Sequence, residues 1–426
     1  MSSDYVPPSA ESNTPAPPRR LAPDVRVALA AAVAITAYAA LAHWLLRPLH
    51  EHGWWQPAVA FLQGFDHLLQ MPGLLLAQTL GLRTGHHTTP AAWGFAALLN
   101  AVGYFLVARG VYVLWKRLVA RPRPAAPSAA DMRSRRRFLA LGVQAACAGT
   151  GAALGYALLV EPRRWIVSRH RIPIRDLPAA LDGLRIVQLT DIHHGPWLSL
   201  PYVQGVIDAA NALEPDLVCL TGDYVHHSPA YIEPVVRELA RLRARIGVVA
   251  VLGNHDWWEG APRMRREFDR AGIPLLDNDR RVLTPERRLA PAADAGLAVA
   301  GVGDLWEDRQ DYQRALGGLP GSMPRLLLSH NPDVAEQAEF IRSGLRVDLM
   351  LSGHTHGGQV RLPGLGAPIS SSRFGQKYSQ GLVEGPVCRV FVCRGIGVSA
   401  FPLRLGVPPE IAVLELQSET RASASE

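Results

Sequence analysis

The sequence predicts an α/β domain preceded by an N-terminal multi-helix membrane region, and three observations lead to this fold class. From residue 161 onward, short β-rich runs alternate with stretches of helical periodicity, which is the pattern of βα units. Before residue 161, apolar stretches long enough to cross a bilayer follow one another. Potential metal ligands follow several of the β-rich runs, and open α/β sheets bind ligands at the carboxyl ends of their strands.

The first part of the chain is read as a tail followed by membrane helices. Residues 1–23 are rich in Pro, Ser and Ala without periodicity, which predicts a disordered tail. Residues 24–115 are predicted to hold membrane helices, with long apolar stretches at 25–46 and 91–115. The stretch 57–82 carries polar side chains and a helix-breaking proline, so it is either a span or an interfacial segment.

Residues 116–137 form the most basic segment, and we expect this linker to stay in the cytoplasm because Lys and Arg mark cytoplasmic loops. The apolar stretch 138–160 is predicted to be a transmembrane helix. It places the domain 161–426 outside the cytoplasm, on the periplasmic face of an inner or cell membrane. The run from Ser134 to Leu139, S-R-R-R-F-L, also resembles a twin-arginine export signal, although a plain basic flank is the alternative.

Composition bounds the partners of this chain. It has 426 residues, 48% of them hydrophobic, and a net charge of +7. Because the basic residues crowd the linker, the charge indicates membrane topology, and we expect no nucleic-acid partner. The four cysteines neither form a zinc-type pair set nor suffice for a disulfide scaffold. A bridge between Cys388 and Cys393 remains open.

The elements of the domain are predicted from hydrophobic period and β-branched content. The β-rich runs are residues 184–190, 216–221, 246–252, 297–302, 325–328, 347–351, 389–393 and 411–416. The helical patterns are residues 202–213, 232–245 and 334–343. The sequence therefore predicts sheets with covering helices.

Five of these strands end in side chains that can bind a metal. The side chains are Asp191 and His193, Asp223, Asn254 with His255 and Asp256, His330, and His354 with His356. A single such residue is usually a helix cap or a turn residue. Five strand ends that each offer carboxylate, amide oxygen or imidazole favour convergence on a metal site, because imidazole and carboxylate are common ligands.

The motif series D-I-H, G-D, G-N-H-D, S-H and G-H-T-H resembles that of the calcineurin-like metallophosphoesterases. The resemblance covers residues 161–416. Residues 184–191 and 394–402 are similar to the membrane-anchored subgroup, which includes UDP-2,3-diacylglucosamine pyrophosphatase-like enzymes. The resemblance implies a sandwich of two mixed β-sheets flanked by helices.

The resemblance also implies a dinuclear metal site. One divalent ion would be held by Asp191, His193, Asp223 and His356, and a second by Asp223, Asn254, His330 and His354, with Asp223 bridging. Mixed carboxylate, amide and imidazole ligands suit Mn, Fe or Zn better than Mg. Two such ions clamp a phosphoryl group and lower the pKa of water, so that no protein nucleophile is needed.

Two residues beside the ligands are assigned catalytic roles. The resemblance makes His255 the residue that protonates or stabilises the leaving oxygen, and an imidazole suits this role near neutral pH. Asp256 is expected to orient His255. The alternative is that His255 is a structural histidine beside the ligands.

Four further features lie outside the predicted ligands and the two catalytic candidates. His194, His226 and His227 are expected to be exposed loop histidines, and a role in binding the substrate is the alternative. Asp304 ends a strand as the ligands do but has no place in the motif series. Trp257 and Trp258 either line the cleft or meet the membrane surface. The loop 361–378 carries three basic residues and either holds an anionic substrate or is simply solvated.

Together these features predict a membrane-anchored metal-dependent hydrolase of P–O bonds. The expected substrate is an amphiphilic, lipid-linked or nucleotide-lipid phosphodiester or pyrophosphate of the UDP-2,3-diacylglucosamine type. That precursor is cytoplasmic, which conflicts with the expected topology, so an envelope phosphodiester is the main competitor. A general or cyclic-nucleotide phosphodiesterase and a non-catalytic membrane sensor are the alternatives.

Overall fold

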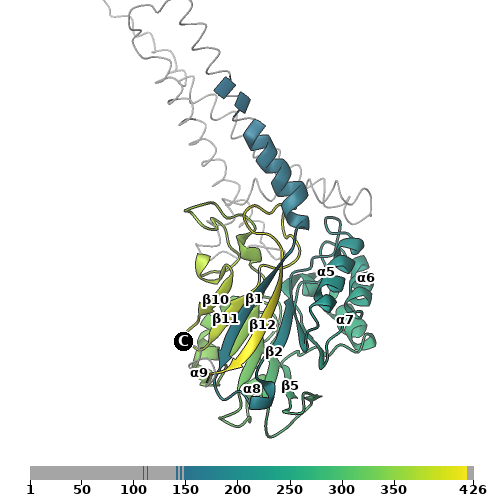
Figure 1. The fold of residues 1–426 in the computed structure, drawn as a ribbon, viewed down its shortest axis with the longest axis vertical. Helices are drawn as coiled ribbons and strands as arrows, with labels where there is room; N and C mark the ends of the chain where they lie inside the picture. The colour runs from purple at the N-terminus through teal and green to yellow at the C-terminus, as the bar shows by residue number, and fades with distance from the viewer. Residues whose placement is uncertain (1–108, 110–112, 114–140, 143, 146–147, 420–426) are drawn as a thin grey trace, which may run out of the picture. The chain divides into compact units, whose positions relative to one another are not determined.

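A computed structural model describes residues 109, 113, 141, 142, 144, 145 and 148–419 (Figure 1). The chain divides into two units, and every described residue except Arg109 and Val113 belongs to the second. The predicted tail 1–23, the linker 116–137 with its twin-arginine-like motif, and all but these two residues of the predicted membrane region 24–115 lie outside the described residues.

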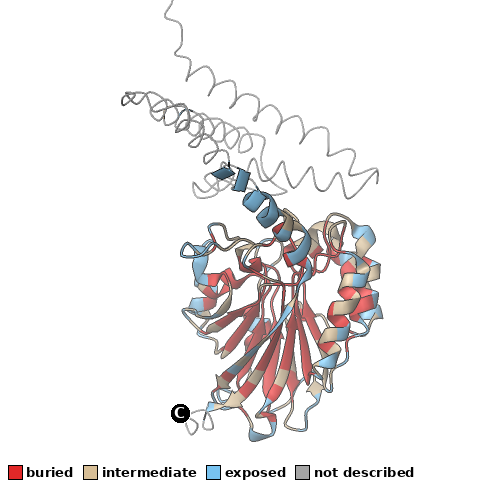
Figure 2. Ribbon diagram, turned by 45° about the horizontal axis from the view of Figure 1, so that its top comes forward, coloured by how far each residue is buried: buried red, intermediate tan, exposed pale blue. Residues whose placement is uncertain are grey.

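The segment that enters the domain is helical. Residues 148–155 are α-helical and continue into a π-helical turn, η1 (Tyr156–Val160). Leu154, Leu159 and Val160 are exposed on it, and Figure 2 shows this segment mostly in the colour of exposed residues. Within the described residues, none of the helices combines the length and apolar character that a membrane span requires.

One sheet has five strands in the order β1-β12-β2-β3-β4. These strands are β1 (Ile166–Ile174), β12 (Glu410–Ser418), β2 (Leu184–Leu189), β3 (Leu217–Thr221) and β4 (Gly247–Val251). Strands β2, β3 and β4 are parallel, whereas β12 is antiparallel to β2 and parallel to β1. Strands β1 and β12, the first and last strands of the described residues, lie side by side in Figure 1.

The other sheet has seven strands in the order β10-β11-β9-β8-β7-β5-β6. These are β10 (Gly381–Glu384), β11 (Arg389–Val392), β9 (Leu349–Ser352), β8 (Arg325–Leu328), β7 (Leu297–Gly301), β5 (Asp279–Leu283) and β6 (Leu289–Ala290). The four central strands are parallel, and the strands at both edges pair antiparallel.

The sheets pack face to face, and helices cover their outer faces. Along β2, Leu184 and Ile186 lie in the core between the sheets, whereas Val187 and Leu189 face the helices, as the two-residue period of a strand requires. The five-stranded sheet is covered by α5 (Leu200–Ala212), α6 (Ile232–Leu239) and α7 (Asn254–Arg270). The seven-stranded sheet is covered by α8 (Tyr312–Leu316), η5 (Pro332–Glu336) and α9 (Ala338–Ser343). The predicted sandwich of two mixed sheets flanked by helices is confirmed.

Some elements differ from the prediction. Strands β1, β5, β6 and β10 and helices α7 and α8 were not expected. Helix α7 contains Gly260 and Pro262, two residues that disfavour helix, and the chain is kinked at Gly260. The helix predicted at 232–245 ends at Leu239, and the one predicted at 334–343 begins as a 3₁₀ turn. Cys388 and Cys393 are both buried free thiols, so no bridge joins them.

Candidate metal centre

The seven predicted ligands lie directly after five parallel strands of both sheets. Asp191 and His193 follow β2, Asp223 follows β3, and Asn254 begins α7 after β4. His330 follows β8, and His354 and His356 follow β9. None of the seven residues exposes more than 6% of its surface. The structure thus brings together every ligand position predicted from the sequence.

The backbone at these residues is unusual. Positive φ angles occur at Asp191 (51°), His193 (49°), Asp223 (57°), His354 (69°) and His356 (51°). Such a conformation costs a non-glycine residue about 1 kcal/mol or more, and it persists only where the surroundings impose it. Its repetition at five predicted ligands is typical of a functional site.

Glycines allow the ligand loops to approach one another closely. A Cβ atom at Gly353 would lie 2.3 Å from Oδ2 of Asp191, and one at Gly253 would lie 2.3 Å from Oδ1 of Asp223. Any side chain at these positions would displace a carboxylate of the site. The glycines of the G-N-H-D and G-H-T-H motifs therefore make room for the carboxylates of other motifs.

One cluster contains Asp191, His193 and His356, whose donor atoms lie within 4.8 Å of one another. Nε2 of His193 is 3.0 Å from Nε2 of His356 and 3.9 Å from Oδ1 of Asp191. Nε2 of His356 is 3.4 Å from the same carboxylate oxygen. Two imidazole nitrogens and a carboxylate that converge in a buried space form a donor set that suits a divalent cation.

A second cluster contains Asp223, His330 and His354, again within 4.8 Å. Nε2 of His330 is 3.2 Å from Oδ2 of Asp223 and 3.2 Å from Nδ1 of His354. The same Oδ2 atom is 3.5 Å from Nε2 of His193 in the first cluster. Oδ2 of Asp223 is therefore within reach of both clusters, as a bridging ligand must be.

Asn254 supplies an independent test of fit. Its Oδ1 atom is buried and has no hydrogen-bond partner among the described residues. A buried carbonyl oxygen without a partner costs about 1–3 kcal/mol, and ligation of a cation removes this cost. The residues present therefore fit two divalent ions.

The pKa values of several predicted ligands are shifted from their usual values by burial and by one another, as is common in functional sites. Burial, together with the Asp223 carboxylate, raises the pKa of Asp191 to about 7. Burial holds the pKa values of His193, His354 and His356 well below the usual range, and neighbouring imidazoles and, at His356, the Arg404 guanidinium lower them further, which favours the neutral rings. Burial lowers the pKa of His330, but nearby carboxylates led by Asp223 outweigh it and raise the value to about 10.

Asp256 does not contact the ring of His255, so the expectation that it orients this ring is wrong. Oδ2 of Asp256 accepts the backbone N–H groups of Asp223 at 2.8 Å and Gly253 at 2.9 Å. Its Oδ1 atom accepts the N–H of Tyr224 at 2.8 Å. A carboxylate at the start of a helix that accepts three backbone donors is a loop clamp.

The partner of His255 is another imidazole. Nδ1 of His255 is 2.8 Å from Nδ1 of His226, and the His255 ring packs edge-on against His193 with centroids 4.7 Å apart. Burial holds the pKa of His255 well below its usual value. The backbone N–H of His255 donates to Oδ1 of Asp223 at 2.9 Å, which fixes the histidine beside the second cluster.

His194 and His226 were expected to be exposed, and this expectation is wrong because both are buried. His194 contacts the carbonyl oxygen of Leu198 through Nδ1 at 2.9 Å. The donor atoms of His226, His255 and His193 lie within 4.8 Å of one another. The loop after Asp223 therefore places His226 against His255, the catalytic candidate. The sequence did not predict this contact, because His226 lies in a loop.

Comparisons with known proteins place this chain in a family. Residues 184–358 match the family model for calcineurin-like phosphoesterases. One relative is YkuE of Bacillus subtilis strain 168, whose name describes it as an uncharacterised metallophosphoesterase. It is 33% identical over 67% of this chain and 98% of its own length. The chain belongs to the calcineurin-like phosphoesterases. It is a metal-dependent phosphoester hydrolase, and its family uses two divalent metal ions.

Two other relatives bear on the role of this phosphoesterase. The phosphodiesterase YaeI of Escherichia coli K12 is 33% identical over 67% of this chain and 100% of its own length. A protein of Danio rerio named as a transmembrane protein with a metallophosphoesterase domain is 29% identical over 74% of this chain and 70% of its own length.

The phosphoesterase site contains an arginine that the sequence analysis missed. Arg404 is fully buried, and its Nη2 atom is 3.3 Å from Nδ1 of His356. The guanidinium also donates to the carbonyl oxygens of Arg394 and Gly397, and burial lowers its pKa to about 10. Its only signal in the sequence is its position between Leu403 and Leu405, where a charge interrupts an apolar run.

Several other polar groups near the phosphoesterase site have structural partners. Oδ1 of the buried Asp304 accepts the N–H groups of Trp306 and Glu307, whereas its Oδ2 atom has no hydrogen-bond partner among the described residues. In the loop 361–378, the Lys377 ammonium pairs with Glu336 at 2.6 Å and the Arg361 guanidinium donates to Ser379. These contacts give the two basic side chains structural partners.

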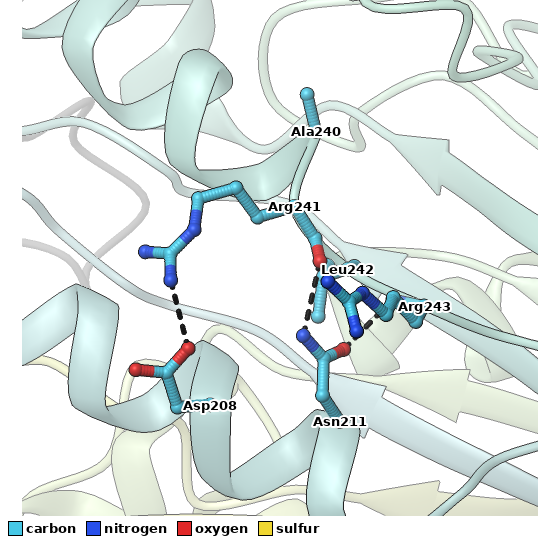
Figure 3. A pocket seen from close by; sticks show the side chains of 6 residues that line it. All are labelled: Asp208, Asn211, Ala240, Arg241, Leu242 and Arg243. Atoms are coloured by element: carbon cyan, nitrogen blue, oxygen red, sulfur yellow. Dashed lines mark hydrogen bonds and ion pairs between the residues drawn. The ribbon is translucent and has the colours of Figure 1, made fainter.

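A hollow also lies on the outer helical layer (Figure 3), and it contains none of the predicted ligands. Its polar groups bond to one another. Arg241 pairs with Asp208 at 2.9 Å, and Asn211 bonds to the backbone at Arg241 and Arg243. The hollow therefore supplies exposed residues that can serve as controls for the phosphoesterase site.

Proposed function

We propose that this chain is a membrane-anchored, extracytoplasmic phosphodiesterase that hydrolyses P–O bonds with two divalent ions, Mn, Fe or Zn. The first ion would be held by Asp191, His193, Asp223 and His356. The second would be held by Asp223, Asn254, His330 and His354. The observation that carries the proposal is the position of Oδ2 of Asp223, 3.5 Å from His193 and 3.2 Å from His330.

Different residues of the chain would bind the ions, act on the leaving oxygen and position the loops. Two divalent ions held at the predicted ligands would supply polarisation of the phosphoryl oxygens and a lowered pKa of water. His255 protonates the leaving oxygen or stabilises it by donating a hydrogen bond, a role supported by its place beside Asn254 and by its contact with His226. Asp256 and Arg404 hold the loops that carry Asp223 and His356.

An amphiphilic substrate is part of the proposal. A lipid-linked phosphodiester of the envelope agrees with an extracytoplasmic domain, whereas turnover of a pyrophosphate of the UDP-2,3-diacylglucosamine type would require the domain to face the cytoplasm. Exposed apolar side chains support an amphiphilic substrate, namely Leu362, Leu365 and Phe374 in the loop after His356. Ser371 of the same loop donates to the carbonyl oxygen of His354, so the apolar loop borders the site. The Escherichia coli relative named a phosphodiesterase supports diesters, and the Danio rerio relative named a transmembrane protein supports anchoring.

The test uses the full chain purified in detergent and loaded with Mn. Bis-p-nitrophenyl phosphate, p-nitrophenyl phosphate and UDP-2,3-diacylglucosamine are compared, with Asp223→Asn as the inactive variant and Asp208→Asn as the surface control. We expect hydrolysis of the diester or the UDP-lipid that is lost only in Asp223→Asn. Turnover of the monoester alone would overturn the diester assignment, and equal turnover by Asp223→Asn would overturn the site.

A further inference from the structure

We infer that Trp258 and Trp306 form an aromatic binding site for a planar group of the substrate, a nucleobase or aryl ring. The inference rests on the proposed function and deepens it, because it names the chemical group that the diester carries. A UDP-linked lipid offers such a group, whereas a phospholipid without a base does not.

The two indoles lie close together at the edge of the metal centre. Their ring centroids are 6.5 Å apart and their planes differ by 26°. Trp258 packs edge-on against His255 with centroids 4.4 Å apart. Trp306 packs edge-on against His354, also at 4.4 Å. The pair therefore extends from the proposed proton donor to a proposed ligand of the second ion, along the space that a bound phosphoester must border.

One turn of the chain holds both rings in place. Oδ1 of Asp304 accepts the N–H groups of Trp306 at 2.8 Å and Glu307 at 3.0 Å. The Glu307 carboxylate accepts the indole N–H of Trp258 at 2.7 Å. Because Asp304 is 1% exposed, the turn is anchored in the interior. Asp304 has no place in the family's motif series. Its role in this inference is to fix the turn that positions the two indoles.

Exposure distinguishes Trp306 from Trp257, whereas Trp257 and Trp258 are both partly buried and differ in their contacts. Trp306 keeps 39% of its surface exposed, so a bound ring has an aromatic surface to cover. Trp257 instead packs against the helical core and beneath the guanidinium of Arg265, 4.7 Å from its ring. Stacking a base on an aromatic side chain strengthens binding about 5- to 150-fold, and it depends little on the base identity.

The test measures dissociation constants by titration calorimetry on the full Mn-loaded chain, with pairs of phosphates that differ in one planar group. One pair is AMP and ribose 5-phosphate, and the other is phenyl phosphate and methyl phosphate. We expect AMP to bind about 5- to 150-fold more tightly than ribose 5-phosphate, and Trp306→Leu to lower this ratio toward one. Trp257→Leu is the matched control and should keep the ratio.

The outcomes distinguish a nucleobase from another aryl ring. They also distinguish failure of this inference from failure of the proposed function. A preference within both pairs assigns any aryl ring, and a preference within the AMP pair alone assigns a nucleobase. Equal affinities within both pairs, or a ratio that Trp306→Leu leaves unchanged, overturn the inference. Weaker binding of Trp306→Leu to phosphatidylglycerol vesicles with an unchanged AMP ratio overturns it in favour of a membrane contact. Hydrolysis of bis-p-nitrophenyl phosphate, measured on the same samples, tests the proposed function separately.

Discussion

Oδ2 of Asp256 accepts the backbone N–H of Asp223 at 2.8 Å, so one buried carboxylate fixes the loop that carries the proposed bridging ligand. The same side chain accepts the N–H groups of Tyr224 and Gly253. The G-N-H-D motif thus joins the loops after β3 and β4. Its aspartate stabilises the metal centre and does not act on His255.

Asp256→Asn should weaken this clamp. The amide presents one NH₂ group to a backbone N–H donor, so at least one of the three hydrogen bonds is lost, at a cost of about 1–3 kcal/mol. Urea denaturation of the metal-free protein measures this loss. Asp208→Asn, which removes an exposed pairing with Arg241, should cost under about 1 kcal/mol. Equal stability of Asp256→Asn and the wild type would contradict the clamp.

His255→Ala should lower the rate according to the leaving group. A general acid contributes about 10²–10⁴-fold when the leaving oxygen needs a proton, and little when it leaves readily as an anion. We therefore expect a large loss of kcat on a methyl-leaving diester and a small loss on bis-p-nitrophenyl phosphate. The ratio of the two kcat values is the readout. Equal losses on both esters would assign His255 a structural role.

Arg404→Met should destabilise the loop of His356. The substitution leaves buried carbonyl oxygens of Arg394 and Gly397 without their donor, and each costs about 1–3 kcal/mol. Thermal unfolding should show a lower Tm, and retention of bound Mn should fall because His356 loses its neighbour. Arg404→Lys should recover part of both. An Arg404→Met variant with the wild-type Tm and Mn content would refute this role.

Metal binding should strengthen as pH rises. In the metal-free domain the pKa of Asp191 is raised to about 7 and that of His330 to about 10, so protons compete with metal at both groups. A group whose pKa is higher in the folded than in the unfolded state contributes to the free energy of unfolding at pH values below its unfolded-state pKa. This contribution is lost as the pH rises through the folded-state pKa, so the metal-free protein becomes less stable. The difference in Tm between Mn-loaded and chelator-treated protein should therefore widen from pH 6 to pH 8. Calorimetric scans check this, and a gap that narrows would contradict it.

Local sequence determined much of this fold because the pattern and the environment agree. Strand β3, Leu-Val-Cys-Leu-Thr, is buried on both faces and reads as a continuous apolar run. Strand β1 was missed because Arg169 and Arg171 interrupt its apolar residues and most of its surface is open. Helix α7 was missed because Gly260 and Pro262 disfavour helix locally, whereas Met264 and Phe268 pack it onto the sheet.

In the site, too, some features could be predicted from local sequence and others could not. The ligand positions followed from the strand ends, since the carboxyl ends of parallel strands meet. The contacts of Arg404 with His356 and of His226 with His255 join residues 48 and 29 positions apart in the chain. No local pattern encodes such pairs. The roles of Asp256 and Trp306 likewise depended on which loops the fold brings together.

The dinuclear site is tested most directly by the number of Mn ions bound per chain, measured by elemental analysis after dialysis of the full protein. We predict two ions in the wild type and in Asp208→Asn. We predict no more than one in Asp223→Ala, with circular dichroism confirming that this variant remains folded. Two ions bound to a folded Asp223→Ala with wild-type affinity, or a wild type that binds only one, would contradict the bridging role of Asp223.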